Sequence, residues 1–172
     1  MNTVPPVHLH GFVFAAHPTT RGFAWVLFES PRKPVAWAIV HARAGRNQYL
    51  ASRFEALIDK YEPTVVVLEA FEDRDSRRKE RIRALCRMMV REVEERAIDL
   101  SIFDRDAIRM AFDRFGANTR SEIARVIADH FDGLSHRIPR ERKLGDSEDV
   151  RQSLFNAAAL ALTYFVSRGE ID

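Results

Sequence analysis

Residues 64–69 read Thr-Val-Val-Val-Leu-Glu, and this run decides which fold the sequence predicts. An unbroken series of apolar, mostly β-branched residues favours a strand that is covered on both faces, as the central strand of a parallel sheet is. Glu69 then lies at the carboxyl end of that strand, where functional groups of open α/β sheets gather. The alternative is that Glu69 is an ordinary solvated strand end or caps the following loop.

Upstream of this run, three short segments rich in aromatic and β-branched residues lie between breaks formed by Pro and Gly. They cover residues 11–16, 22–29 and 35–41, and they predict three strands joined by short connections in an antiparallel meander. The apolar spacing then changes to a helical period over 47–60, and Pro63 ends that helix.

Downstream of Glu69 the apolar spacing predicts four helices and one more strand. The first helix covers 76–97, and a strand follows over 100–103. A brief second helix is capped by Asp104 or Asp106 and ends at 112, and a third runs from Thr119 or Ser121 to 131. A basic loop covers 133–145, and the last helix runs from Ser147 to about 167. Strands that alternate with helices after a meander predict an α/β fold with a mixed five-stranded sheet flanked by helices.

Composition limits the class of protein. A chain of 172 residues with 46% apolar residues and 27 basic against 25 acidic side chains fits a single globular domain over 1–172, in which 1–10 is an N-terminal extension. No apolar run is long enough for a bilayer span, and no signal peptide is recognisable. The single cysteine excludes an internal disulfide and a cysteine-rich zinc site. We therefore expect a cytoplasmic protein without a membrane partner.

The predicted last helix opens with four polar residues, Asp-Ser-Glu-Asp at 146–149. Acids in a first helical turn are ordinary capping residues. However, Asp149, Ser153 and Asn156 are spaced by four and three residues and would share one helix face, which Glu69 could meet at the sheet edge. Carboxylates brought together in this way repel one another unless a hard divalent cation, Mg²⁺ or Mn²⁺, lies between them. Such metals organise phosphodiester hydrolysis.

Four strings along the chain match a known family in their order. They are AHPTTRGFA at 16–24, VVVLE at 65–69, the pair of predicted helices within 106–126, and NAAALALTY at 156–164. Together, over about residues 11–166, they resemble the RuvC-type Holliday junction resolvases of the RNase H-like superfamily. The resemblance implies an RNase H-like sheet of three antiparallel and two parallel strands. It also implies a metal-dependent endonuclease that cuts branched DNA such as Holliday junctions as a homodimer.

The chain departs from the family pattern at the acidic site. The Asp of the family's first strand falls on His17, and the acids of its last helix fall on Ser153 and Asn156, so that only Glu69 matches. Under the endonuclease hypothesis we expect catalytic roles for Glu69, Asp149 and Asn156. We then expect metal ligands at Glu69, Asp146, Asp149 and His17, with Mg²⁺ or Mn²⁺ as the cofactor; Asp146 and Asp149 lie one to two turns before the positions of the family's acids. The departures keep two alternatives open: a catalytically inactive binding or scaffolding module that retains the fold, and a protein-interaction domain.

Basic residues point to a nucleic-acid partner, with DNA expected. Thr119 and Arg120 fall where the family has basic residues that contact the junction. The loop before the last helix contributes Arg137, Arg140, Arg142 and Lys143, and it contains few acids. Arginine and lysine side chains neutralise phosphates, so these six residues are the predicted nucleic-acid contacts. The alternative is that they only form a solvated surface.

Overall fold

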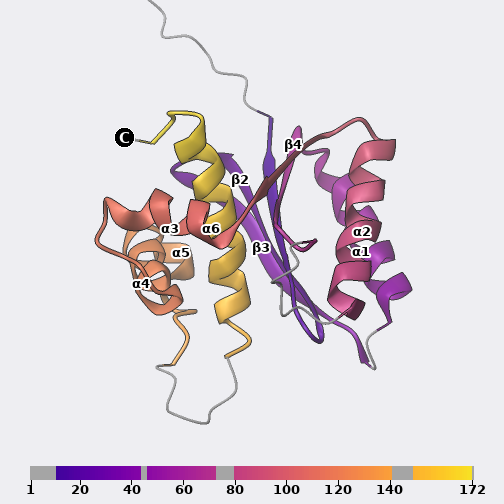
Figure 1. Ribbon diagram of the computed structural model, residues 1–172, viewed down its shortest axis with the longest axis horizontal. Helices are drawn as coiled ribbons and strands as arrows, with labels where there is room; N and C mark the ends of the chain where they lie inside the picture. The colour runs from indigo at the N-terminus through magenta and orange to yellow at the C-terminus, as the bar shows by residue number, and fades with distance from the viewer. Residues whose placement is uncertain (1–10, 44–45, 73–79, 141–148, 172) are drawn as a thin grey trace, which may run out of the picture.

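The computed structural model describes residues 11–43, 46–72, 80–140 and 149–171, which build one five-stranded sheet in the order β3-β2-β1-β4-β5 (Figure 1). The strands are β1 (Val13–Pro18), β2 (Gly22–Ser30), β3 (Lys33–His41), β4 (Val65–Glu69) and β5 (Asp99–Phe103). The first three strands pair antiparallel, whereas β4 is parallel to both β1 and β5. This arrangement confirms the predicted mixed sheet with β4 in its interior.

Helices cover both faces of the sheet (Figure 1). Helices α1 (Asn47–Tyr61) and α2 (Glu80–Glu95) pack on one face, and α3 (Arg105–Asp113), α4 (Arg120–His130), α5 (Asp132–Ser135) and α6 (Gln152–Ser167) cover the other. Side chains of β4 alternate between the two layers: Val65 and Val67 belong to the core beneath α6, while Val66 and Leu68 belong to the core beneath α1 and α2. This double burial explains why the strand is apolar without interruption.

Helix α6 packs against the sheet through a buried face that combines alanines with large apolar side chains. Ala157, Ala158 and Ala161 are fully buried against the sheet layer. At its carboxyl-terminal half, Phe165 packs edge-on against Phe28 of β2, with 6.0 Å between the ring centroids. This packing holds the helix over β1 and β4, so its amino-terminal turns lie near the ends of those strands.

The turn between β1 and β2 is shorter than the sequence predicts. His17 and Pro18, expected in the turn, continue β1 and pair with Ala24 and Phe23 of β2. The chain then reverses over residues 19–21, where the Thr19 N–H donates to the Gly22 carbonyl at 2.8 Å. Pro18 permits this extension because it is the last residue of the strand, where a missing N–H costs no internal ladder bond.

Glycine is required where β2 begins. A Cβ built on Gly22 would lie 1.8 Å from the carbonyl oxygen of Val40 in β3, so no side chain fits between the two backbones. The strand β3 itself starts at Lys33, two residues before the predicted boundary. Its Pro34 is tolerated because β3 is an edge strand and its pairing with β2 is shifted in register there.

The last helix starts later than predicted. Residues 149–151 form a turn, and α6 begins at Gln152, because the Asp149 carboxylate accepts the Arg151 backbone N–H at 2.9 Å, a local bond typical of turns. Asp149 therefore does not share a helix face with Ser153 and Asn156, which corrects the prediction. The proposed cap, Ser147, lies outside the described residues.

Two further boundaries differ. The predicted basic loop 133–145 begins within a single helical turn, α5. The helix predicted over 76–97 is described from Glu80 as α2, because residues 76–79 lie outside the described residues. The predicted N-terminal extension, 1–10, is also outside the described residues. Among the helices that are described, none has both the length and the apolar character needed to cross a membrane.

Candidate nucleic-acid interface

Strands β1 and β4 end side by side, and each presents one polar side chain to the α6 face of the sheet. His17 and Glu69 follow the alternation of Val13 and Val65, whose side chains face α6. Each is buried, with 7% of its surface exposed. The Nδ1 atom of His17 lies 3.2 Å from Oε2 of Glu69, an ion-pair distance. A buried carboxylate needs such a partner, because desolvation of an isolated charge is costly.

This pair is continued into α6 by two amides. Asn156 Nδ2 lies 3.3 Å from His17 Nε2, and Gln152, one turn earlier, donates from Nε2 to Asn156 Oδ1 at 3.0 Å. Gln152 Nε2 also donates to the carbonyl oxygen of Arg120, the first residue of α4, at 3.5 Å. A polar chain of Glu69, His17, Asn156 and Gln152 thus joins two strands to two helices.

The direction of donation along this polar chain assigns His17 Nε2 as an acceptor. The Arg120 carbonyl can only accept, so Gln152 turns its amide nitrogen toward it and toward Asn156 Oδ1. Asn156 then presents its own NH₂ to His17 Nε2, which must accept. The other ring nitrogen, Nδ1, lies beside Glu69 Oε2 at an ion-pair distance, and its geometry does not meet the criteria of a hydrogen bond.

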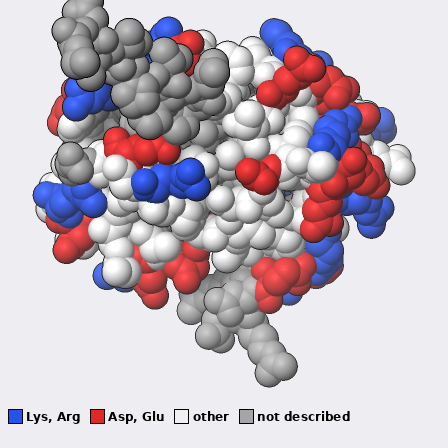
Figure 2. Space-filling view, turned by 90° about the horizontal axis from the view of Figure 1, so that it is seen from above, with Lys and Arg blue, Asp and Glu red and all other residues white. Residues whose placement is uncertain are grey.

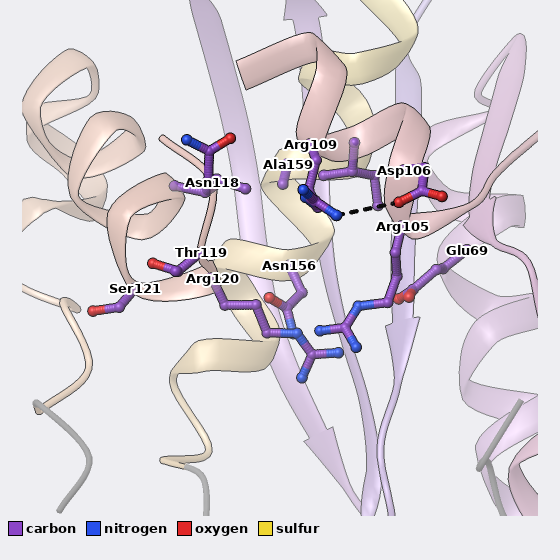
Figure 3. A pocket seen from close by; sticks show the side chains of 12 residues that line it. Glu69, Arg105, Asp106, Arg109, Asn118, Thr119, Arg120, Ser121, Asn156 and Ala159 are labelled. Atoms are coloured by element: carbon purple, nitrogen blue, oxygen red, sulfur yellow. Dashed lines mark hydrogen bonds and ion pairs between the residues drawn. The ribbon is translucent and has the colours of Figure 1, made fainter. Parts of the chain in front are cut away.

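A cavity of about 620 Å³ opens in front of Glu69 and Asn156 (Figure 3). Its basic lining residues are Arg105, Arg109 and Arg120. A second cavity of about 590 Å³ shares Arg105 and Arg120 with the first, so the two adjoin, and adds Arg125 and Arg140. Five arginines therefore surround this pair of cavities, which we call the arginine groove.

The acids of the arginine groove already have basic or imidazole partners. Asp106 lies 3.4 Å from Arg109, and Glu69 lies beside His17. Asp149, which lines the second cavity, pairs with Arg151 at 2.7 Å and accepts the Arg140 N–H at 3.3 Å. The Arg151 side chain, followed by these backbone N–H groups, lowers the pKa of Asp149 to about 2. Among the described residues that line the groove, the arginines outnumber the acids.

The N-terminus of α4 lies at this groove and is capped by side-chain hydrogen bonds. Thr119 accepts the Glu122 N–H, and the Glu122 carboxylate accepts the N–H groups of Asn118 and Thr119 at 2.8 and 2.9 Å. These bonds form a capping box and lower the pKa of Glu122. The Thr119 hydroxyl is therefore used in capping, and the cap positions Arg120 at both cavities.

The described residues do not fit a site for Mg²⁺ or Mn²⁺. Among them, no group of three or more His, Cys, Asp or Glu side chains could hold a metal ion. Glu69 is the one carboxylate of the polar chain, His17 turns one nitrogen to Glu69 and the other to Asn156, and the Asn156 oxygen already accepts from Gln152. Hard cations require several oxygen ligands. Asp146, a further predicted ligand, lies outside the described residues.

The structure thus brings together three of the predicted site residues, Glu69, His17 and Asn156. Asp149 lines the neighbouring cavity instead. Of the predicted nucleic-acid contacts, Arg120 and Arg140 line the groove, Arg137 is exposed beside His136, and Arg142 and Lys143 lie outside the described residues.

Sequence reasoning did not select two important residues, Arg105 and Gln152. The signal for Arg105 was available: β5 is the parallel neighbour of β4, Glu69 pairs with Phe103, and Arg105 starts the next helix two residues later. No local signal marks Gln152, because its role depends on the contact between α6 and α4.

No protein-family model and no curated protein matches this sequence. Solved structures do match in fold. Thermus thermophilus RuvC has a TM-score of 0.66 at 13% identity, with 92% of this chain and 97% of that chain covered. The T. thermophilus RuvC complex with Holliday junction substrate gives 0.66 at 15% identity, covering 94% and 98%. The yeast mitochondrial Holliday junction resolvase gives 0.64 at 12% identity, covering 96% and 82%.

These likenesses extend over nearly the whole chain, and they confirm the RNase H-like α/β fold in the form found in RuvC-type Holliday junction resolvases. At identities of 12–15% the likeness is one of fold.

Proposed function

We propose that this protein binds branched DNA, such as Holliday junctions, through the arginine groove. The observation that carries the proposal is the gathering of five arginines around two adjoining cavities, from α3, α4 and the segment after α5. Guanidinium groups bind phosphate oxygens by paired, charge-assisted hydrogen bonds, and they do so without reading the base sequence. A ligand recognised by its branched backbone fits such a surface.

The fold supports the same class of ligand. A RuvC of the same architecture has been solved with a Holliday junction substrate, and its likeness to this chain covers 94% of the residues. The proposal includes a homodimer, because a four-way junction offers two equivalent positions that a two-fold assembly matches.

A second candidate function is metal-dependent cleavage of the junction. It is favoured by one observation: Glu69 occupies the carboxyl end of the interior strand β4, at the edge of the cavity (Figure 3). It requires acids beyond those of the polar chain, and Asp146 is the candidate from outside the described residues. The polar chain favours binding without cleavage, since it lacks the second and third carboxylate.

The test measures affinity for a four-way junction and for a duplex of the same arms, by fluorescence anisotropy, across a salt series. We expect tighter binding to the junction and a logarithm of affinity that falls linearly with the logarithm of salt concentration. Arg105→Gln/Arg120→Gln should weaken binding, whereas Arg91→Gln, an exposed arginine of α2 on the other face of the sheet, should not. Equal effects of both changes would contradict the proposal.

Cleavage is assayed on the same junction with Mg²⁺ or Mn²⁺. Strand scission that Glu69→Gln abolishes would establish the second candidate. Binding without scission, equal for the wild type and Glu69→Gln, is the result expected of a binding module.

A further inference from the structure

We propose that the cavity at the end of β4 takes a phosphodiester directly, with no divalent cation between the phosphate and Glu69. This inference rests on the proposed function in one respect, that a DNA phosphate is the natural ligand. It assigns the cavity an anion as its ligand, which is opposite in charge to the metal that the fold family implies.

The first support is that the Glu69 carboxylate, which would be the metal ligand, already contacts His17. Its Oε2 atom lies 3.2 Å from Nδ1 of His17, and both side chains are buried. A cation that took Oε2 as a ligand would have to displace the imidazole from that oxygen.

The second support is that His17 is held in place from behind. Asn156 donates to its other nitrogen, and Gln152, only 7% exposed, orients Asn156 and is itself bonded to the Arg120 carbonyl. Rotation of His17 away from Glu69 would break this series of bonds. His17 is therefore a positioning residue, which keeps its imidazole in contact with the Glu69 carboxylate.

The third support is the charge that faces Glu69 and Asn156. Arg105 and Arg120 extend toward one another across the cavity from α3 and α4, in front of the Asn156 amide (Figure 3). Two guanidinium groups supply the positive charge that a bridging cation would bring to a phosphate. Arg105 forms no ion pair with the other described residues, so its donors can reach a ligand without breaking one.

The first experiment is a metal titration without DNA. Thermal unfolding of the full chain, followed by circular dichroism with EDTA, Mg²⁺ or Mn²⁺ at matched ionic strength, should give the same midpoint for the wild type. His17→Asp/Asn156→Asp, which supplies three carboxylates with Glu69, should gain a midpoint increase with Mn²⁺ that the wild type lacks. Should that variant fail to fold, Asn156→Asp alone provides the test. A Mn²⁺-dependent increase in the wild type that Glu69→Gln removes would overturn the inference.

The second experiment tests the anion. Inorganic phosphate is titrated by calorimetry in EDTA, where Arg105→Gln and Arg120→Gln should each weaken binding about tenfold and Arg91→Gln should not, as expected for loss of a charge-assisted hydrogen bond. Phosphate binding that requires added Mg²⁺ or Mn²⁺, or that is absent from the wild type, contradicts the inference.

Junction binding in EDTA separates the two proposals. If junction binding is retained in EDTA, the result supports both the proposed function and the metal-free phosphate site. If binding is lost in EDTA and restored by Mn²⁺, only the inference of a metal-free phosphate site is overturned. If the junction does not bind while phosphate still binds through Arg105 and Arg120, the proposed function fails and the anion site stands.

Discussion

Two groups of arginines in this protein look alike in the sequence and differ in their surroundings. On the α1–α2 side, Arg96 contacts Asp59 at 3.0 Å, Glu55 at 3.4 Å and also Glu92. Asp59, and after it Glu92, raise the pKa of Arg96. Acidic and basic side chains interleave on that side of the molecule (Figure 2). In the arginine groove, Arg105 and Arg120 instead face a cavity. We expect an arginine surrounded by acids to contribute to stability, and the proposed function assigns a phosphate ligand to the arginines that line the cavity.

The largest effect should follow from removing the two arginines that line both cavities. Arg105→Gln/Arg120→Gln should reduce junction affinity about a hundredfold and make the salt dependence shallower by about two counterions, because two phosphate contacts are lost. Anisotropy across a salt series measures both quantities. An unchanged slope would mean that these arginines do not contact phosphates and that the comparison with Arg96 fails.

His17→Ala should destabilise the protein by about 3 kcal/mol, because it leaves the Glu69 carboxylate buried without its imidazole. Chemical denaturation at pH 7 measures the change. His41→Ala, at the exposed end of β3, is the matched control and should alter stability by less than about 0.5 kcal/mol. Equal losses for both variants would remove the argument for a buried pair.

Arg96→Gln should change stability and leave junction affinity unchanged, whereas the Arg105→Gln/Arg120→Gln variant should lower junction affinity. It should cost about 1 kcal/mol of stability, since a network of three acids loses its shared, partly exposed cation, while junction affinity stays the same. Denaturation and anisotropy on one preparation check both parts. Weaker junction binding by this variant would show that the α1–α2 side also contacts DNA.

The smallest effect concerns Asp149, whose pKa is lowered to about 2 mainly by the Arg151 side chain. Because the pKa of Asp149 is lower in the folded state, the charged carboxylate stabilises the fold at pH values above its ordinary pKa of 3.8. This contribution to stability is lost as the pH falls toward 2. Asp149→Asn should therefore destabilise the protein by about 0.5 kcal/mol at pH 7, discounted for partial exposure, and by less at pH 3. A difference that stays constant with pH would contradict this account.

Most of the fold was predictable because its signals are local. The uninterrupted run before Glu69 marks an interior strand. Of the two cap candidates expected for each helix, Asp104 caps α3 and Thr119 caps α4. The start of α6 was not predictable from helix propensity, because a bond between the Asp149 side chain and the Arg151 backbone ends the helical pattern early.

The candidate site was predictable only in part. The place of Glu69 followed from its strand, and the resemblance to a known family singled out His17 and Asn156. That these three side chains meet, and that Gln152 completes the polar chain, depends on how α6 crosses the sheet and meets α4.

The amino-acid sequence by itself determined the order of strands and helices and the interior place of β4, because these follow from residue type and periodicity along the chain. Only the tertiary structure decided which charges meet: it paired Glu69 with His17, surrounded Arg96 with acids and turned Arg105 and Arg120 to one cavity. The physical reason is that electrostatic interactions depend on distance in space and on burial, neither of which sequence separation specifies.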